Sequence, residues 1–280
     1  MKQCTKDVYF HPGLGKVAST FLQYNFFPKL RGIHYIQRTK YVKAPEIIRR
    51  SGDEKFLISR EFDKNRYLER ESQFIAGHLK NVKPILILRR HDQWIASQYR
   101  RYAKNGFPLT FRQFFDIHTD QGRWQQHDLV YMDKIRLLEH YFDHKPLVLF
   151  FDQLIDNPYA FFDRLAGYMG ASYNKKAINT RRRHTSYNEK QMRATRKVGH
   201  YINIQPQKRL KNPVLDKLRH WYVAIVRYSV LYGALFIPEK WMDNEPFIPK
   251  DDLDKIHEHY VADWEKCHAY ARANNPVLQD

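Results

Sequence analysis

The sequence is poor in cysteine and in acidic residues. Its two cysteines, Cys4 and Cys267, stand near opposite ends of the 280-residue chain. That placement argues against a disulfide framework or a cysteine-based metal site, and it is typical of a reducing compartment. Asp and Glu number 30 against 48 Lys and Arg, which gives a net charge of +18. Such a basic chain favours an anionic partner: a nucleotide, a polyanionic glycan, nucleic acid or a lipid surface.

Long uninterrupted hydrophobic runs are also missing. The N-terminus, MKQCTKDVYF, lacks the apolar segment of a signal peptide. Residues 215–236 are apolar on nearly every side from Trp221 onward, but Arg227 and several tyrosines interrupt them, so we expect no membrane span. We therefore predict a cytoplasmic protein. Because basic residues lead into this segment, two interpretations stay open: packing within the protein, or peripheral contact with the anionic inner face of a membrane.

The stretch DVYFHPGLGKVASTFLQ, residues 7–23, lacks one hydroxyl residue of a known phosphate-binding motif. A β-branched and aromatic run precedes a turn containing Gly13 and Gly15, then Lys16, then a helix start. Glycines let backbone N–H groups approach an anion, and a helix N-terminus adds its positive end. A Walker A motif has Ser or Thr directly after its lysine, whereas Val17 follows here. The stretch predicts a phosphate-binding loop without the hydroxyl that holds Mg²⁺; a plain strand-to-helix turn with a solvated lysine is the simpler alternative.

Short apolar runs alternate with helical patterns along the chain. This alternation predicts an α/β fold with a P-loop-like central parallel sheet flanked by helices. We predict this core over residues 1–200 and a helical C-terminal extension over residues 201–280. The predicted strands are residues 8–10, 32–36, 55–59, 84–88 and 146–151. The predicted helices are residues 19–26, 45–50, 65–80, 92–104, 109–117, 128–142, 158–168, 215–236 and 251–273.

Three charged residues each come just after a predicted strand: Lys16, Glu61 and Arg89. In open parallel sheets, ligands bind at the carboxyl ends of the strands. We expect these side chains to converge there, although they are distant in sequence. Their convergence is stronger evidence for a site than any one of them alone.

The cationic residues among them fit the binding of an anionic group. Lys16 is expected to bind the bridging and non-bridging oxygens of a transferred group, and Ser19 and Thr20 to hydrogen-bond the same group. Arg89 ends a strand, and Ser97 lies about one and a half turns into the following helix. That spacing predicts that Arg89 and Ser97 contact a second anion together.

For the remaining candidate site residues, the neighbouring sequence is compatible with more than one role. Glu61 stands among basic residues and is interpreted as a general base for an acceptor hydroxyl; the alternatives are a surface ion pair or a histidine base such as His34. The basic run RRRHTS contains Arg183 and Ser186. It is interpreted either as a solvated loop or as a segment that closes over a nucleotide.

Taken with these spacings, the chain resembles the sulfotransferase family that uses 3′-phosphoadenosine 5′-phosphosulfate (PAPS), in particular its bacterial, carbohydrate-type branch. GKVAST, residues 15–20, takes the place of the family loop P-K-T-G-[ST]-[ST], with Gly15, Val17 and Ala18 in place of Pro, Thr and Gly. LISREF around Glu61, FFDQLIDNP at residues 150–158 and HTSYN around Ser186 resemble further family segments. The resemblance covers about residues 5–190.

The resemblance implies a sulfuryl transfer from PAPS to a hydroxyl, which leaves 3′-phosphoadenosine 5′-phosphate (PAP) and needs no metal. Lys16 and Glu61 would be catalytic, and Arg89 and Ser97 would bind the 3′-phosphate. The acceptor would be a carbohydrate, a glycolipid or a related molecule, held by loops such as residues 40–52, 107–126 and 197–211. The residues implied in cofactor binding are Gly13, Gly15, Lys16, Val17, Ala18, Ser19, Thr20, Arg89, Ser97, Arg183 and Ser186.

Three other functions stay open at this point. A P-loop kinase of small molecules would require Mg²⁺, and the residue after Lys16 argues against it. A nucleic-acid binder would fit the charge, but no known nucleic-acid motif is present, so we consider nucleic acid an unlikely partner. A non-catalytic relative that only binds nucleotides or glycans would fit the altered loop.

Overall fold

The computed structural model describes residues 6–180, 187–205, 210–238 and 246–276. The chain divides into two compact units, each built from separate stretches of the sequence. The first unit comprises Met1–His91, His127–Arg181 and His259–Asp280, and the second comprises Asp92–Gln126 and Arg182–Glu258.

The first unit is built on a five-stranded sheet with the order β2-β3-β1-β4-β5, in which every described pairing is parallel. The inner strands are apolar on both faces, as expected when helices cover a sheet on both sides. The α/β fold with a parallel sheet is therefore confirmed. The strands are β1 (Asp7–His11), β2 (His34–Ile36), β3 (Lys55–Ser59), β4 (Val82–Leu88) and β5 (Leu147–Phe150).

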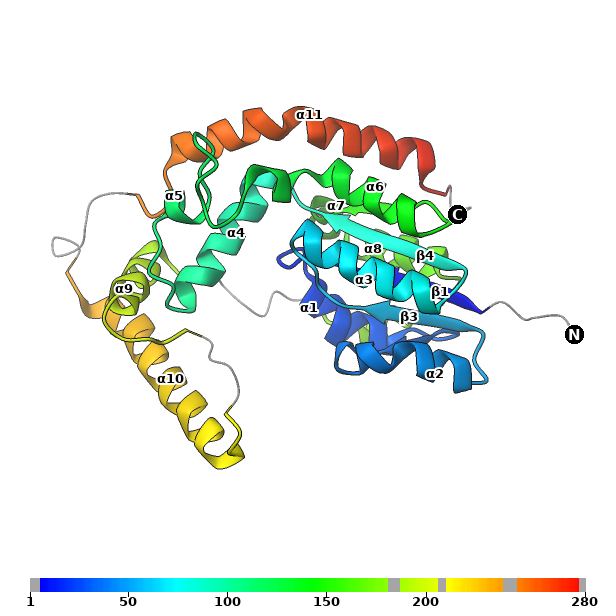
Figure 1. The fold of residues 1–280 in the computed structure, drawn as a ribbon, viewed down its shortest axis with the longest axis horizontal. Coiled ribbons are helices and arrows are strands. Elements are labelled where there is room, and N and C mark those ends of the chain that lie inside the picture. Colours follow the sequence, from blue (N-terminus) through cyan, green and yellow to red (C-terminus); the bar gives the residue numbers. More distant parts are fainter. Residues whose placement is uncertain (1–5, 181–186, 206–209, 239–245, 277–280) are drawn as a thin grey trace, which may run out of the picture. The chain divides into compact units, whose positions relative to one another are not determined.

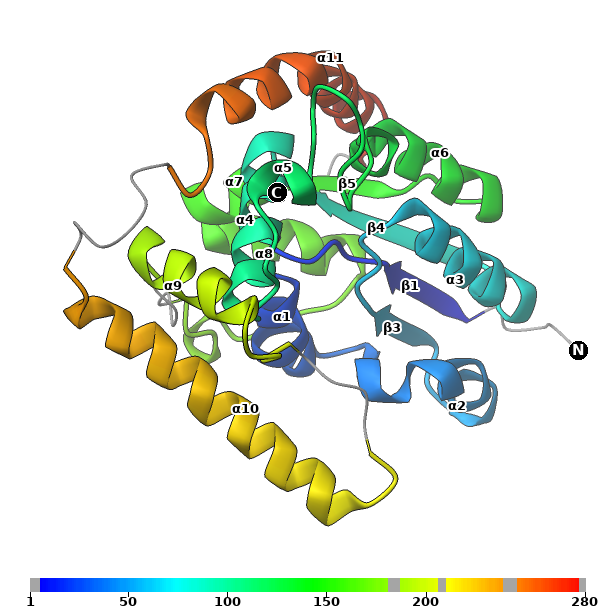
Figure 2. The same cartoon turned by 60° about the vertical axis from the view of Figure 1, so that its left-hand side comes forward.

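Helices cover both faces of this sheet. Figures 1 and 2 show α3 and α6 on one face, and α1 and α8 on the other. On the second face, Phe26 stacks on Phe162 with ring centroids 4.6 Å apart. The helices of this unit include α1 (Ser19–Phe21), α2 (Ala44–Arg50), α3 (Asn65–His78), α6 (Tyr131–Tyr141), α7 (Phe151–Asp156) and α8 (Pro158–Tyr168).

The C-terminal part of α11 (Lys250–Asn274) packs on the first unit through a buried histidine. The imidazole of His91 lies 3.0 Å from Asp263 and stacks on Tyr260. Asp263 also accepts the backbone N–H groups of Tyr131 and Met132. Burial by itself would raise the pKa of Asp263, but the hydrogen bond from His91 and the two amides outweigh it and lower the pKa. The C-terminal part of α11 is thus anchored by a stabilised carboxylate.

β5 is an edge strand of the sheet, and the Asn275 side chain hydrogen-bonds the backbone on its outer side. Asn275 donates to the carbonyl of Val148 and accepts from the N–H of the same residue, at 2.7 and 2.9 Å. It therefore takes the two hydrogen bonds that a further strand would make at Val148. An edge strand satisfied in this way is a poor template for pairing with another chain.

The second unit is helical. It contains most of α4 (His91–Lys104), then α5 (Phe111–Phe114), α9 (Glu189–Gly199) and α10 (Pro213–Gly233). The α9–α10 pair is joined by the side chain of Gln191, which donates to the carbonyl of Leu231. Gly199 and Gly106 approach so closely that a Cβ on Gly199 would lie 2.2 Å from the carbonyl oxygen of Gly106.

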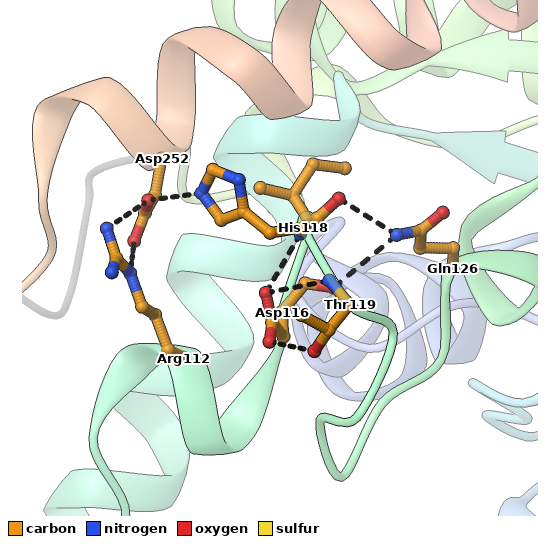
Figure 3. Close-up of polar contacts among 7 residues, drawn as sticks. Arg112, Asp116, His118, Thr119, Gln126 and Asp252 are labelled. Carbon is orange, nitrogen blue, oxygen red and sulfur yellow. Dashed lines mark hydrogen bonds and ion pairs between the residues drawn. The ribbon is translucent and has the colours of Figure 1, made fainter.

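A polar network holds the segment 107–126 of the second unit (Figure 3). Asp252 is almost fully buried and accepts two hydrogen bonds from the Arg112 guanidinium, at 3.0 and 3.1 Å. His118 lies 3.4 Å from the same carboxylate, and Asp116 accepts the backbone N–H of His118. Burial would raise the pKa of Asp252, but Arg112 and His118 outweigh it and lower the pKa. This segment, predicted to be an acceptor loop, is therefore internally braced.

Most predicted elements are present with small changes at their ends. The helix after the loop continues as a π-helical turn, Leu22–Phe26, and the predicted helix over residues 109–117 is shortened to α5. The helices α7 and α9 (Glu189–Gly199) were not predicted. Helix α7 follows β5 without an intervening turn residue. No helix in the described part of the chain is long and apolar enough to cross a membrane.

Candidate functional site

The carboxyl ends of three adjacent strands form the candidate site. β1 lies between β3 and β4, and Lys16, Glu61 and Arg89 follow these three strands. Because all three strands are parallel, their following segments leave the same edge of the sheet. Each of the three side chains is partly exposed at this edge.

Backbone hydrogen bonds join the segments that leave β1 and β3. The N–H of Arg60 donates to His11, and the N–H of Phe62 donates to Gly13, at 3.1 and 2.9 Å. These two bonds flank Glu61 and fix its backbone beside the loop. Glu61 is thereby held next to the glycine turn by the fold itself.

The segment that follows β4 contacts the lysine loop directly. The Arg89 guanidinium donates to the backbone carbonyl of Lys16 at 3.3 Å and lies over the Phe151 ring, 4.8 Å from its centroid. The carbonyl of Arg89 accepts the Tyr131 hydroxyl at 2.8 Å. Arg89 is therefore braced on both its backbone and its side chain.

The loop backbone is unusual at two positions. Lys16 and Ala18 have φ angles of 69° and 63°, in the left-handed region that non-glycine residues seldom adopt. Such a conformation costs a residue with a Cβ about 1–2 kcal/mol. A glycine would adopt this backbone conformation at lower cost than Ala18 does. Strain of this kind is most often retained at functional sites.

Side chains of the loop have different surroundings. Val17 is fully buried, so only its backbone can meet a ligand. Ser19 is also buried, and its hydroxyl donates to the carbonyl of Leu14 at 2.6 Å, whereas Thr20 is exposed. The N–H of Gly15 donates to the Asp63 carboxylate at 2.6 Å. In this structure Ser19 and the Gly15 amide thus brace the loop itself.

Gly13 is required by close packing under the loop. A Cβ there would lie 2.5 Å from the His11 ring and 2.9 Å from the Ser19 hydroxyl, both of them buried. We expect Gly13→Ala to lower the free energy of unfolding by about 1–3 kcal/mol, as overpacking does. Gly77→Ala is the matched control, because nothing lies within 4 Å of its Cβ and its helical position favours alanine. Urea denaturation curves compare the two, and equal stability of both variants would contradict this packing.

His11 is the last residue of β1 and is fully buried beneath the loop. Its Nδ1 lies 2.8 Å from the Ser59 hydroxyl, which also accepts from Gln23 at 3.1 Å. Among the described residues, none is a hydrogen-bond partner for its Nε2. Burial lowers the pKa of His11 to about 3, so the folded protein holds it neutral.

The buried His11 predicts a specific acid sensitivity. Its pKa is 6.5 when unperturbed and about 3 in the fold, so between these values the unfolded chain binds a proton that the folded chain does not. Stability should therefore fall as pH drops below 6.5, by about 1.4 kcal/mol per pH unit from this group. Urea denaturation from pH 7 to 4 measures the slope. In His11→Asn, which keeps a polar contact to Ser59 without titrating, the slope should be smaller by that amount; an unchanged slope would contradict the assignment.

Other predicted residues lie elsewhere. Ser97 belongs to α4 in the second unit, and its pairing with Arg89 stays a prediction. Arg183 and Ser186 lie outside the described residues. His34 begins β2 and pairs with Asp53 at 2.7 Å, at the amino ends of the strands. That is the edge opposite the lysine loop, so the structure does not bring His34 together with Lys16.

An open depression of about 440 Å³ also lies at the amino ends of β2 and β3. It is lined by Gly32, Ile33, His34, Asp53, Glu54 and Lys55. Its walls include none of Lys16, Glu61 and Arg89. In the described part of the chain, no group of three or more His, Cys, Asp or Glu side chains could hold a metal ion.

The similarities of this chain to known proteins are structural. No family model matches the chain, and no curated protein matches it. Among solved structures, a sulfotransferase from Alicyclobacillus acidocaldarius is 12% identical, with a TM-score of 0.48, over 70% of this chain and 93% of that one. A mouse sulfotransferase complexed with PAP is 14% identical, with a TM-score of 0.37, over 61% and 60%. Likeness of this degree does not by itself carry an activity to this chain.

Proposed function

We propose that this protein is a sulfotransferase that moves a sulfuryl group from PAPS to a hydroxyl of a carbohydrate, glycolipid or related acceptor. The observation that supports it most is the delivery of Lys16, Glu61 and Arg89 to one sheet edge by three adjacent parallel strands. The contact of Arg89 with the Lys16 backbone adds to it. An ammonium, a carboxylate and a guanidinium at one edge can serve a base-assisted transfer between anionic groups.

In this proposal the loop binds the 5′-phosphosulfate. Backbone N–H groups of residues 16–20 and the Thr20 hydroxyl would donate to its oxygens, while Ser19 and the Gly15 amide hold the loop in shape. Lys16 would stabilise the negative charge that develops on the phosphate oxygen as the sulfur–oxygen bond breaks. The left-handed conformation at Ala18, where the family loop has glycine, supports this use of the loop.

Glu61 would act as the general base. Its carboxylate would take the proton of the acceptor hydroxyl while that oxygen attacks sulfur in line. The electron pair of the broken bond would stay on the phosphate of PAP. The protein's contribution is then positioning and electrostatics, as in phosphoryl transfer. A sulfuryl group carries less charge than a phosphoryl group, so the proposal includes no metal.

Arg89 would hold the 3′-phosphate that distinguishes PAP from AMP. We expect Arg89→Ala to weaken PAP binding about 10–100-fold, since a charge-assisted hydrogen bond contributes about 1.5–3 kcal/mol. Calorimetric titration measures this. AMP affinity should change much less, because AMP has no 3′-phosphate, and Arg50→Ala, an exposed arginine on α2, should leave both unchanged. Equal losses for PAP and AMP in Arg89→Ala would contradict this role.

The cofactor is tested by thermal shift with PAP, ATP and AMP, with and without Mg²⁺. A ligand that binds only the folded state raises the melting temperature by mass action. We expect PAP to stabilise the protein most, and without Mg²⁺. Selective stabilisation by Mg²⁺ and ATP would favour the kinase instead, and stabilisation by any oligonucleotide with a steep salt dependence would favour a nucleic-acid binder.

A further inference from the structure

The helix α10 carries an exposed apolar stripe. Its members recur every three or four residues, so they lie along one side of the helix. Two of them, Val214 and Trp221, are 64% and 66% exposed. The stripe consists of Val214, Leu218, Trp221, Ile225, Tyr228 and Tyr232.

The opposite side of α10 packs against the rest of the second unit. Leu231 is fully buried, and its carbonyl accepts the side chain of Gln191 on α9. Arg227 donates to the carbonyl of Ile204. The helix is therefore oriented within its unit, and the stripe is the side that is left uncovered there.

Exposed apolar side chains are concentrated around this helix. Of the 20 large hydrophobic residues that are exposed among the described residues, 14 lie between Tyr201 and Ile237, and the other six are scattered. Scattered exposed apolar residues need no explanation, whereas a contiguous patch indicates a contact surface. Phe236, in the short helix Ala234–Phe236 that follows α10, is 88% exposed.

Three features favour a lipid surface over a second copy of the chain. Leu215 and Tyr222 are also exposed and widen the stripe on one flank. The apolar seam between two paired helices uses only two of every seven residues, so this stripe is wider than such a seam. Trp and Tyr, with an apolar body and a polar edge, suit the headgroup level of a bilayer. Lys217 lies beside the stripe, and the chain's net charge of +18 opposes self-association but attracts an anionic surface.

The acidic residue on α10 itself is paired with a basic side chain. Asp216 is the one acidic residue between Leu210 and Pro238. It pairs with Arg219 at 2.8 Å and accepts the N–H of Leu210. Lys211 and Lys217 are both exposed. Between Leu210 and Pro238, the described segment therefore presents exposed basic side chains and one paired carboxylate.

We propose that α10 docks on an anionic membrane surface, with its apolar stripe at the boundary of headgroups and acyl chains. Lys211 and Lys217 then meet lipid phosphates. The attachment is peripheral, and its strength depends on both apolar area and surface charge. This inference is independent of the proposed sulfuryl transfer.

Vesicle flotation of the full chain tests the proposal. The vesicles are phosphatidylcholine alone, or phosphatidylcholine with about one third phosphatidylglycerol. We expect binding to the anionic vesicles to be at least about 10-fold stronger, and to weaken with salt. Trp221→Ser/Ile225→Ser should reduce it by about 10-fold or more. Tyr24→Ser, an exposed aromatic residue in the first unit, is the control and should bind as the parent does.

Unchanged melting temperatures verify that the variants are folded, as expected for exposed positions. A second folded variant, Lys217→Gln, should lose part of the preference for anionic vesicles. Two results would overturn the proposal. One is equal binding of the parent and the stripe variant to anionic vesicles, including no binding by either. The other is a dimer in lipid-free solution that the stripe variant abolishes, because the stripe would then be an interface between two copies.

Discussion

Lys16→Ala should abolish sulfuryl transfer, with a loss of at least about 10²–10³-fold in kcat, the effect of removing one transition-state stabiliser. The lysine follows β1 and its backbone is held by Arg89, so its ammonium is delivered to the sheet edge where the phosphosulfate is proposed to bind. The loss should be largest in kcat, because the charge on the leaving phosphate oxygen develops only in the transition state. The release of PAP from PAPS measures it.

The control for this variant is Lys80→Ala. Lys80 is an exposed lysine just before β4, at the amino ends of the strands, and its loss should leave the activity unchanged. Both variants should melt within a few degrees of the parent. A Lys16→Ala protein with full activity would refute the proposed mechanism, and equal losses in both variants would indicate a general effect of charge.

Glu61→Gln should lower kcat by about 10²–10⁴-fold, the range for a general base. The substitution keeps the size of the side chain and removes its ability to take a proton. Hydrogen bonds of Arg60 and Phe62 to the β1 segment fix the backbone on both sides of Glu61, so the variant should keep its geometry. PAP affinity should be unchanged, which separates this variant from the loop variants.

Glu54→Gln is the matched control, because Glu54 is exposed and precedes the same strand at its other end. Its activity should equal that of the parent. If Glu61→Gln retained parental kcat, Glu61 would not be the base, and another group at the carboxyl edge would have to take the proton.

The sheet and its loop could be predicted from the sequence because their signals are local. The apolar run of residues 84–88 marks the end of β4, and the glycine turn before Lys16 marks the end of β1. Parallel pairing then brings these strand ends to one edge of the sheet. That Lys16, Glu61 and Arg89 follow strands ending at that same edge is a consequence of the sheet topology. This is why three residues far apart in the sequence could be proposed together.

The supports of the loop could not be predicted, because they depend on tertiary contacts. Asp63 binds the Gly15 amide, and Phe151 stacks under Arg89, yet neither belongs to a pattern that marks such a role. His11 had one usable signal, since a histidine that ends an apolar strand directly before a glycine turn is poorly placed for solvent. Its complete burial, and the fit of Gly13 against its ring, required the structure.

The helix α10 shows a further limit of pattern reading. Its apolar character on nearly every side from Trp221 onward is compatible with burial inside the protein, but periodicity cannot tell which side is covered. In the second unit, α9 covers one side and the stripe from Val214 to Tyr232 stays exposed. Helix α10 thus has one side at the surface of its unit. The sequence pattern could not show this, because it depends on which neighbouring elements cover the helix.

A crystal structure of the protein grown with PAP would test the central claim most directly. The account predicts the 5′-phosphate within hydrogen-bond distance of Lys16 Nζ and of the amides of residues 16–20. It also predicts the 3′-phosphate on the Arg89 guanidinium, with Glu61 facing the position that the sulfuryl group would occupy. PAP bound at any other edge of the sheet, or with Lys16 and Arg89 turned away from both phosphates, would contradict it.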